Sequence, residues 1–89
     1  MLEQQIEITN VLGLHARAAA KLVSTAAAYQ CRVTLEFAGQ TADAKSIMSV
    51  MMLAAAKGSL ISIVCDGNDE QAAMTAQIEL IQGLFGEEE

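Results

Sequence analysis

The fold is decided by residues 16–37, which read ARAAAKLVSTAAAYQCRVTLEF. The first part is rich in alanine, the strongest helix former, and it carries one apolar stripe at helical spacing, made of Ala19, Leu22, Val23 and Ala26. The second part alternates apolar with polar residues, which is typical of a strand with one buried face. The stretch therefore predicts a helix over residues 16–29, followed by a strand over residues 31–37.

The sequence on either side supplies three more strands. Polar and apolar residues alternate over residues 5–9, which predicts a half-buried first strand. A glycine-containing hairpin turn at residues 38–40 leads into a short strand near residues 41–44. The β-rich segment 60–65 places alternate apolar residues on one face and predicts the last strand.

Two further helices are expected. Ser46 can cap a short helix that runs through the apolar residues Ile47, Met48, Val50 and Met51. Asp69 can cap a final helix that continues to about Phe85, where Gly86 would end it. The resulting order, β-α-β-β-α-β-α, predicts a single α+β domain over residues 1–89. Its architecture is an open-faced β-sandwich, a four-stranded antiparallel sheet with three helices packed on one face.

Charge and composition exclude several classes of protein. The formal net charge is −6 at pH 7, and the closing run Glu87-Glu88-Glu89 is expected to form a solvated acidic tail. Because nucleic-acid-binding proteins present a basic face, nucleic acid is not an expected partner. The opening residues resemble no secretory signal, and no stretch approaches the ~18 apolar residues of a membrane span. Cys31 and Cys65 form no metal or disulfide pattern, so we expect reduced, buried thiols in a cytoplasmic protein without membrane insertion.

The single histidine, His15, stands where a helix is expected to begin. The first backbone N–H groups of a helix lack intrahelical partners, and the helix dipole adds partial positive charge there. Both effects stabilise a bound dianion. Arg17, two residues later, can offer planar donors to phosphate oxygens. Since phosphoryl transfer needs mainly positioning and charge neutralisation, this pair indicates a phosphohistidine site without a metal or cofactor.

Other roles for His15 stay open on spacing alone. A histidine at a helix start is more often a surface or capping residue. A zinc site has no His or Cys partner at ligand spacing, and no serine stands in a nucleophile elbow for Ser-His-Asp hydrolysis.

Two motifs together resemble a known family. Gly13-Leu14-His15-Ala16-Arg17, followed by Ala44-Lys45-Ser46-Ile47-Met48, is similar to HPr, the histidine-containing phosphocarrier of the bacterial sugar phosphotransferase system. The resemblance implies that His15 accepts a phosphoryl group on Nδ1 from phosphorylated Enzyme I, which draws it from phosphoenolpyruvate. His15 then passes the group to a IIA component of a sugar permease. Arg17 and the backbone N–H groups of Ala16 and Arg17 would hold the phosphoryl oxygens. Such a protein is a stoichiometric carrier without independent turnover, and a monomer is expected.

The resemblance also assigns a docking surface and a regulatory site. Ile47, Met48 and Met51, with Ala20 beside the histidine, match the apolar surface that contacts partners. Ser46 matches a serine that HPr kinase/phosphorylase modifies in many relatives, which weakens docking to Enzyme I. On sequence alone, these apolar residues can equally be core, and Ser46 can equally be a plain cap. A helix this short cannot bury all its apolar residues, however, so some are expected to be exposed.

One residue departs from the family pattern, and two rival interpretations remain. Ala18 stands where the family often has proline, whose fixed φ suits the first helical turn; the helix should survive, with less rigid positioning of Arg17. The closest rival is a nitrogen-branch regulatory phosphocarrier. The second is a catalytically silent small α/β binding module, which would carry no phosphate on His15.

Overall fold

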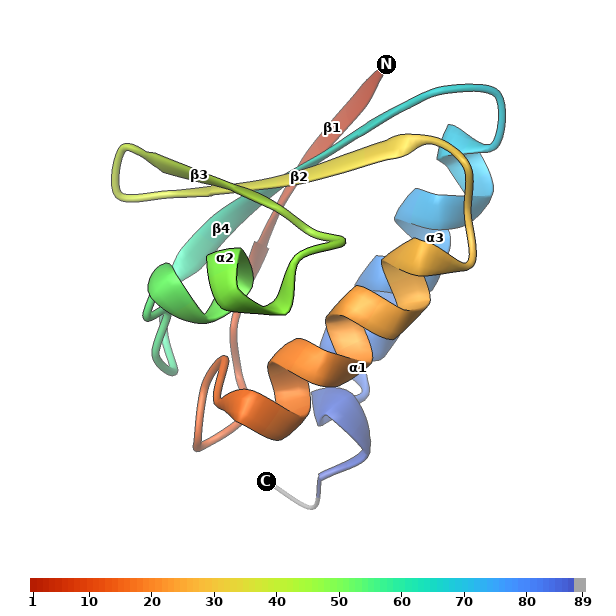
Figure 1. Ribbon diagram of the computed structural model, residues 1–89. Coiled ribbons are helices and arrows are strands. Elements are labelled where there is room, and N and C mark those ends of the chain that lie inside the picture. Colours follow the sequence, from red (N-terminus) through yellow and green to blue (C-terminus); the bar gives the residue numbers. More distant parts are fainter. Residues whose placement is uncertain (88–89) are drawn as a thin grey trace.

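The computed structural model describes residues 1–87 and shows one open sheet with helices on one of its faces (Figure 1). The order of elements is the predicted one, and the α+β open-faced architecture is confirmed. In chain order the elements are β1 (Leu2–Glu7), α1 (Ala16–Ala27), β2 (Arg32–Phe37), β3 (Gln40–Asp43), α2 (Ile47–Met52), β4 (Leu60–Asp66), α3 (Glu70–Gln82) and a 3-10 turn, η1 (Leu84–Gly86).

The sheet has the strand order β1-β4-β2-β3, and every neighbouring pair is antiparallel. The two central strands face each other with Leu35 opposite Ile63, and β1 joins β4 with Ile6 opposite Ile61. Because successive side chains point to opposite faces, the apolar half of each strand lies under the helices and the other half faces water. Val33, Leu35, Ile61 and Ile63 are fully buried in this way.

Each helix buries one side against the rest of the protein, and the apolar stripe is clearest in α1. In α1 the buried residues are Ala18, Ala19, Leu22 and Ala26. The small alanines leave space for α2 and α3, both of which pack against α1. Full burial of a side chain such as Leu22 stabilises the fold by about 2 kcal/mol.

Before the last helix, two elements differ from the sequence-based prediction by two or more residues at a boundary, and the others differ by at most one. The first strand covers Leu2–Glu7 instead of residues 5–9, because it pairs along its whole length with β4. The first helix ends at Ala27, two residues early, and the N–H groups of Ala28 and Tyr29 close a tighter final turn onto Thr25 and Ala26.

The end of the last helix was predicted wrongly. The last helix stops at Gln82 instead of Phe85, since Leu84 and Phe85 adopt positive φ angles of 59° and 55°. This turn folds the chain back, so that Phe85 is buried and its carbonyl accepts a hydrogen bond from Lys21 Nζ. The predicted solvated tail is wrong for Glu87, whose side chain is only 14% exposed. Residues 88 and 89 lie outside the described part of the chain.

Asp69 occupies the predicted N-cap position of α3, but its side chain does not form the hydrogen bond expected of a cap. It instead accepts hydrogen bonds from the backbone N–H groups of Gln30 (2.8 Å) and Cys31 (2.9 Å), which ties the start of α3 to the segment before β2.

The thiols of Cys31 and Cys65 are free and buried, as expected. Burial raises the pKa of the Cys65 thiol to about 11. Among residues 1–87, no helix has the length and apolar character needed to cross a membrane.

Candidate functional site

His15 occupies the N-cap position of α1, with extended backbone angles of φ −72° and ψ 177°. Its ring makes no capping hydrogen bond to the helix, so the first-turn N–H groups stay available to a ligand. The preceding loop is held from two sides: Gly13 N–H donates to the Asn10 carbonyl (3.2 Å), and Leu14 N–H donates to the Ala55 carbonyl (2.9 Å). The loop therefore presents the His15 side chain, 26% exposed, at the end of the helix.

The His15 ring contacts a residue that the sequence analysis did not assign to the site. Ring Nε2 forms a hydrogen bond with Oε2 of Glu87. The other carboxylate oxygen of Glu87 accepts a hydrogen bond from Asn10 Nδ2 at 2.9 Å, and the same Asn10 nitrogen donates to the Gly13 carbonyl at 2.9 Å. No local pattern could have found this contact, because it depends on the reversal of the chain at Leu84 and Phe85.

The charge state of Glu87 determines which nitrogen of the neutral His15 ring carries the free lone pair. The Asn10 amide, and next the His15 ring, donate hydrogen bonds that hold the pKa of the Glu87 carboxyl below its ordinary value. An ionised carboxylate can only accept hydrogen bonds, so Nε2 of His15 must be the donor. In the neutral ring, Nδ1 then carries the lone pair and can act as a nucleophile.

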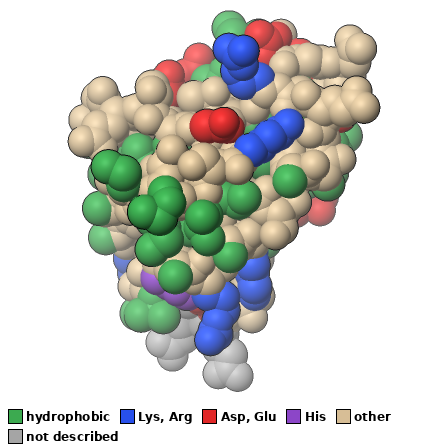
Figure 2. All heavy atoms as spheres, viewed as in Figure 1, with side chains coloured by type: hydrophobic (Ala, Val, Ile, Leu, Met, Phe, Trp, Pro, Cys, Tyr) green, Lys and Arg blue, Asp and Glu red, His purple; other side chains and the backbone are tan. Residues whose placement is uncertain are grey.

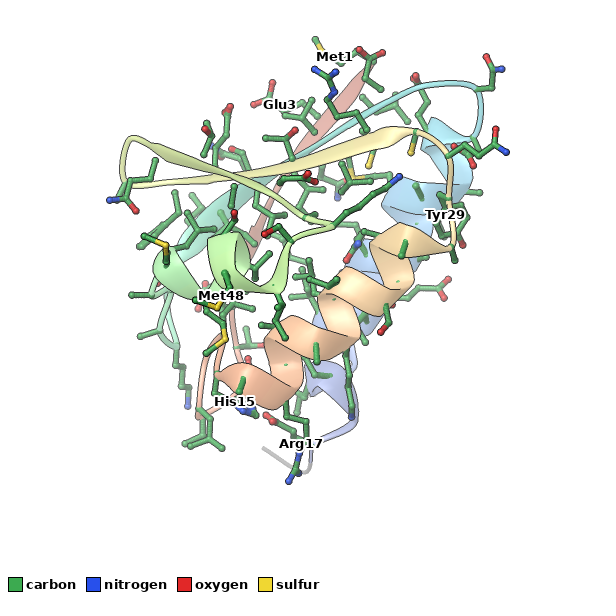
Figure 3. The ribbon with its side chains drawn as sticks, in the orientation of Figure 1. Met1, Glu3, His15, Arg17, Tyr29 and Met48 are labelled. Carbon is green, nitrogen blue, oxygen red and sulfur yellow. The ribbon has the colours of Figure 1, made fainter. Side chains whose placement is uncertain are left out.

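The predicted cationic residue, Arg17, lies in the first turn of α1 at the same end of the molecule as His15 (Figure 3). Both Arg17 and Ala16 are exposed, so the guanidinium and the first-turn backbone are accessible from solvent. Lys21, one turn further along α1, adds a second cation on this side, and Figure 2 shows Lys and Arg side chains next to the histidine. The structure thus brings together the residues predicted to bind phosphate.

The short helix α2 exposes most of its apolar side chains. Val50 is buried and Leu53 nearly so. The remaining large apolar residues form what we call the α2 patch, Ile47, Met48, Met51 and Met52, and all four are exposed, as the sequence analysis expected for some of them. Figures 2 and 3 show hydrophobic side chains gathered over α2 on the same face as His15, with Met48 among them. Ala20, half-buried on α1, lies on the helix against which α2 packs.

Ser46 is the N-cap of α2, as predicted. Its hydroxyl oxygen accepts a hydrogen bond from Ser49 N–H at 3.4 Å, a long distance for such a bond. The side chain is partly exposed at the edge of the α2 patch. A group added to its oxygen would therefore lie beside these apolar residues.

Comparisons with known proteins agree with the geometry. The family model described as PTS HPr component phosphorylation site matches residues 2–83. The chain is 50% identical over 88 residues to the phosphocarrier protein HPr of Xylella fastidiosa, and the match covers 99% of each chain. It also resembles a crystal structure of HPr from Thermoanaerobacter tengcongensis, with a TM-score of 0.96, 40% identity and complete coverage of both chains.

The chain belongs to the HPr family, the phosphocarriers of the phosphotransferase system. Its partners are accordingly proteins of that system, and the interpretation as a silent binding module is not favoured. A crystal structure of an HPr dimer from T. tengcongensis is also similar, with a TM-score of 0.79, 40% identity, and coverage of 98% of this chain and 100% of that chain. The expected monomer therefore stays a prediction.

Proposed function

We propose that His15 is the residue that carries the phosphoryl group, and that Nδ1 is the atom to which the group is bound. The observation that carries this proposal is the hydrogen bond from Nε2 to Glu87, which leaves the Nδ1 lone pair free beside the start of α1. Arg17 supplies an exposed guanidinium at the same end of the helix. The site needs no metal for this chemistry, because backbone N–H groups and a cation can neutralise the phosphoryl oxygens.

The transfer step follows from this arrangement. The Nδ1 lone pair forms the new N–P bond while the bond between phosphorus and the donor's leaving atom breaks, and that electron pair departs with the donor. The phosphoryl oxygens move toward the N–H groups of Ala16 and Arg17 and toward the Arg17 guanidinium. Because Nε2 keeps its proton, the ring gains positive charge as the bond forms. Transfer to the acceptor reverses these changes and restores the neutral ring.

The donor proposed is phosphorylated Enzyme I, charged by phosphoenolpyruvate, and the acceptor is a IIA component of a sugar permease. Docking is assigned to Ile47, Met48 and Met51 together with Ala20. Support comes from the exposure of the three α2 residues on the same face as His15, since a patch of exposed apolar side chains near a reactive group is typical of a protein interface. We further expect a monomeric protein in the cytoplasm.

Incorporation of phosphate tests the assignment of His15. Incubation with phosphoenolpyruvate and Enzyme I should add one acid-labile phosphate to the protein, and ³¹P NMR should locate it on Nδ1. The His15→Ala variant should take up none. Labelling of that variant at the wild-type level would show that another residue is the carrier.

Ser46 is the proposed regulatory site, phosphorylated by HPr kinase/phosphorylase. A phosphate at a helix N-terminus is favourable for the helix itself, so α2 should remain folded. Beside the α2 patch, however, the added charge must lose water when a partner docks, which weakens docking. Ser46→Asp should therefore slow phosphoryl uptake by His15, whereas Ser46→Ala should not. Equal uptake by wild type and Ser46→Asp would remove the proposal.

A further inference from the structure

We propose that Glu87 and Asn10 are positioning residues that select the reactive form of His15, an inference that rests on the proposed phosphocarrier function. Glu87 lies 72 positions after His15 in the sequence and belongs to neither of the family motifs. Its carboxylate joins Asn10 and His15 through its two oxygens. The arrangement parallels a carboxylate that orients a catalytic imidazole through the nitrogen remote from the reaction.

The first task of Glu87 is to fix the position of the proton on the ring. A carboxylate facing Nε2 stabilises the tautomer with the proton on Nε2 and destabilises the one in which Nε2 carries a lone pair. Only the first tautomer has a nucleophilic Nδ1. The same hydrogen bond also fixes the rotation of the ring, so that Nδ1 is held in one direction for in-line attack.

The second task is electrostatic. When Nδ1 forms its bond to phosphorus, the proton stays on Nε2 and the imidazole becomes positively charged. The negative charge of Glu87, hydrogen-bonded to Nε2, balances the positive charge that develops in the transition state. When the phosphoryl group leaves, the electron pair of the N–P bond returns to Nδ1 and the ring is neutral again.

Asn10 holds the carboxylate in place. Its side chain is fully buried, and its amide nitrogen donates both to the Gly13 carbonyl and to Glu87. Since an amide NH₂ group has two hydrogens, both hydrogens of this nitrogen are engaged in hydrogen bonds. The side chain therefore cannot rotate without losing a buried hydrogen bond. Asn10 therefore presents a fixed donor to Oε1 of Glu87 and leaves Oε2 for the histidine.

The turn that carries Glu87 is itself anchored to the body of the protein. Phe85 is buried in the core, and its carbonyl accepts a hydrogen bond from Lys21 Nζ. Figure 1 shows this last turn lying against the first half of α1. His15 is the N-cap of this helix, and Lys21 lies in its second turn. The positive charge of Lys21 also contributes to lowering the pKa of the Glu87 carboxyl. The contact with His15 is thus part of the folded structure and does not depend on a loose tail.

The bonding of Asn10 makes Glu87→Gln a sharp test. A glutamine at this position has one acceptor oxygen, and the fixed Asn10 donor would orient that oxygen toward itself. The NH₂ group would then face His15 Nε2, which must become an acceptor, and the proton would move to Nδ1. The near-isosteric Gln variant should therefore transfer phosphate more slowly than Glu87→Ala, which leaves Nε2 free to donate to water. A merely structural role predicts the opposite order.

The experiment measures two properties of the full chain for wild type, Glu87→Gln, Glu87→Ala and the matched control Glu79→Ala. Glu79→Ala removes the same charge from an exposed position on α3. Ring ¹⁵N chemical shifts of His15, recorded where the ring is neutral, report the tautomer without any partner protein. The rate of phosphoryl uptake from phosphoenolpyruvate and Enzyme I reports function.

Wild type and Glu79→Ala should show the proton on Nε2 and equal uptake rates. Glu87→Gln should shift His15 to the Nδ1–H tautomer and should take up phosphate about tenfold or more slowly than wild type. Glu87→Ala should lie between wild type and Glu87→Gln. The inference is overturned if Glu87→Gln retains the wild-type tautomer, or if its uptake rate equals or exceeds that of Glu87→Ala. Absence of phosphate on His15 in wild type would instead refute the proposed function, and the ring spectra would still decide whether Glu87 selects the tautomer.

Discussion

The backbone of Gly13 lies so close to that of Ala55 that a Cβ atom at position 13 would come within 2.7 Å of the Ala55 oxygen. The same oxygen accepts the hydrogen bond from Leu14 N–H. Gly13 also has a φ of 66°, a conformation that other residues rarely adopt. The segment that follows α2 thus packs directly against the loop that carries His15.

Gly13→Ala should reduce both stability and transfer. The new methyl group must displace backbone atoms of Ala55 and Ala56, and the positive φ adds strain, so we expect a loss of about 1–3 kcal/mol in the free energy of unfolding. Urea unfolding followed by circular dichroism measures this loss. Gly39→Ala is a suitable control, because its φ is also positive but nothing lies within 4 Å of its added Cβ. Equal losses in the two variants would show that the contact with Ala55 is unimportant.

Met48→Asp should weaken docking and leave the fold intact. The Met48 side chain is 67% exposed, so an aspartate there costs little in the free protein, but its charge must lose water against an apolar partner surface. We expect the rate of phosphoryl uptake at limiting Enzyme I to fall about fivefold or more, with an unchanged melting temperature. Ala72→Asp adds the same charge at an exposed position on α3 and should keep the wild-type rate. If both variants lose the same activity, the effect is one of net charge and not of the α2 patch.

Asp69 should make the stability of the protein dependent on pH in the acidic range. The N–H of Gln30, and also that of Cys31, hold the pKa of the Asp69 carboxyl below its ordinary value of 3.8. A carboxyl with a lowered pKa in the folded state stabilises that state above its unfolded pKa, and the contribution disappears as the pH falls through the folded pKa. The stability difference between wild type and Asp69→Asn should be constant near neutrality and shrink below about pH 4. Urea unfolding from about pH 6 to about pH 2.5 measures this difference.

Glu70, whose pKa is also lowered, is present in both proteins, so its effect cancels to first order. A difference independent of pH would contradict the assignment to the Asp69 charge.

Cys65 should react slowly with alkylating reagents in the folded protein. Burial raises its pKa from 9.0 to about 11, and the reactive thiolate is correspondingly scarce. Iodoacetamide at about pH 8 should label Cys65 at least about a hundredfold more slowly in the folded state than in urea. The raised pKa also contributes to the stability of the fold, because the folded state favours the neutral thiol. This contribution to stability is complete below pH 9 and is lost as the pH rises toward 11. Mass spectrometry after digestion locates the label, and rapid labelling of Cys65 in the folded protein would contradict the burial.

The fold could be predicted well because its signals are local. The alanine-rich stripe of α1 and the alternation in β2 follow directly from helical and strand periodicity, and the order of elements allowed few other architectures. His15 and Arg17 share a helix start because they are two residues apart, and no tertiary contact is needed to bring them together. The boundaries were less predictable, since the ends of β1 are set by its partner β4.

The environment of His15 was decided by the tertiary structure alone. Glu87 belongs to a run of glutamates whose local sequence indicates only a solvated tail, and it reaches the ring because Leu84 and Phe85 reverse the chain while Phe85 enters the core. Asn10 became part of the site in the same way, through a buried side chain whose two hydrogen bonds join the loop to the end of the chain. The sequence by itself therefore determined the elements, their order and the proposed reactive pair His15 and Arg17, because these depend on neighbours along the chain. The contact of Glu87 with the histidine ring depends on packing between distant segments, and only the tertiary structure could decide it.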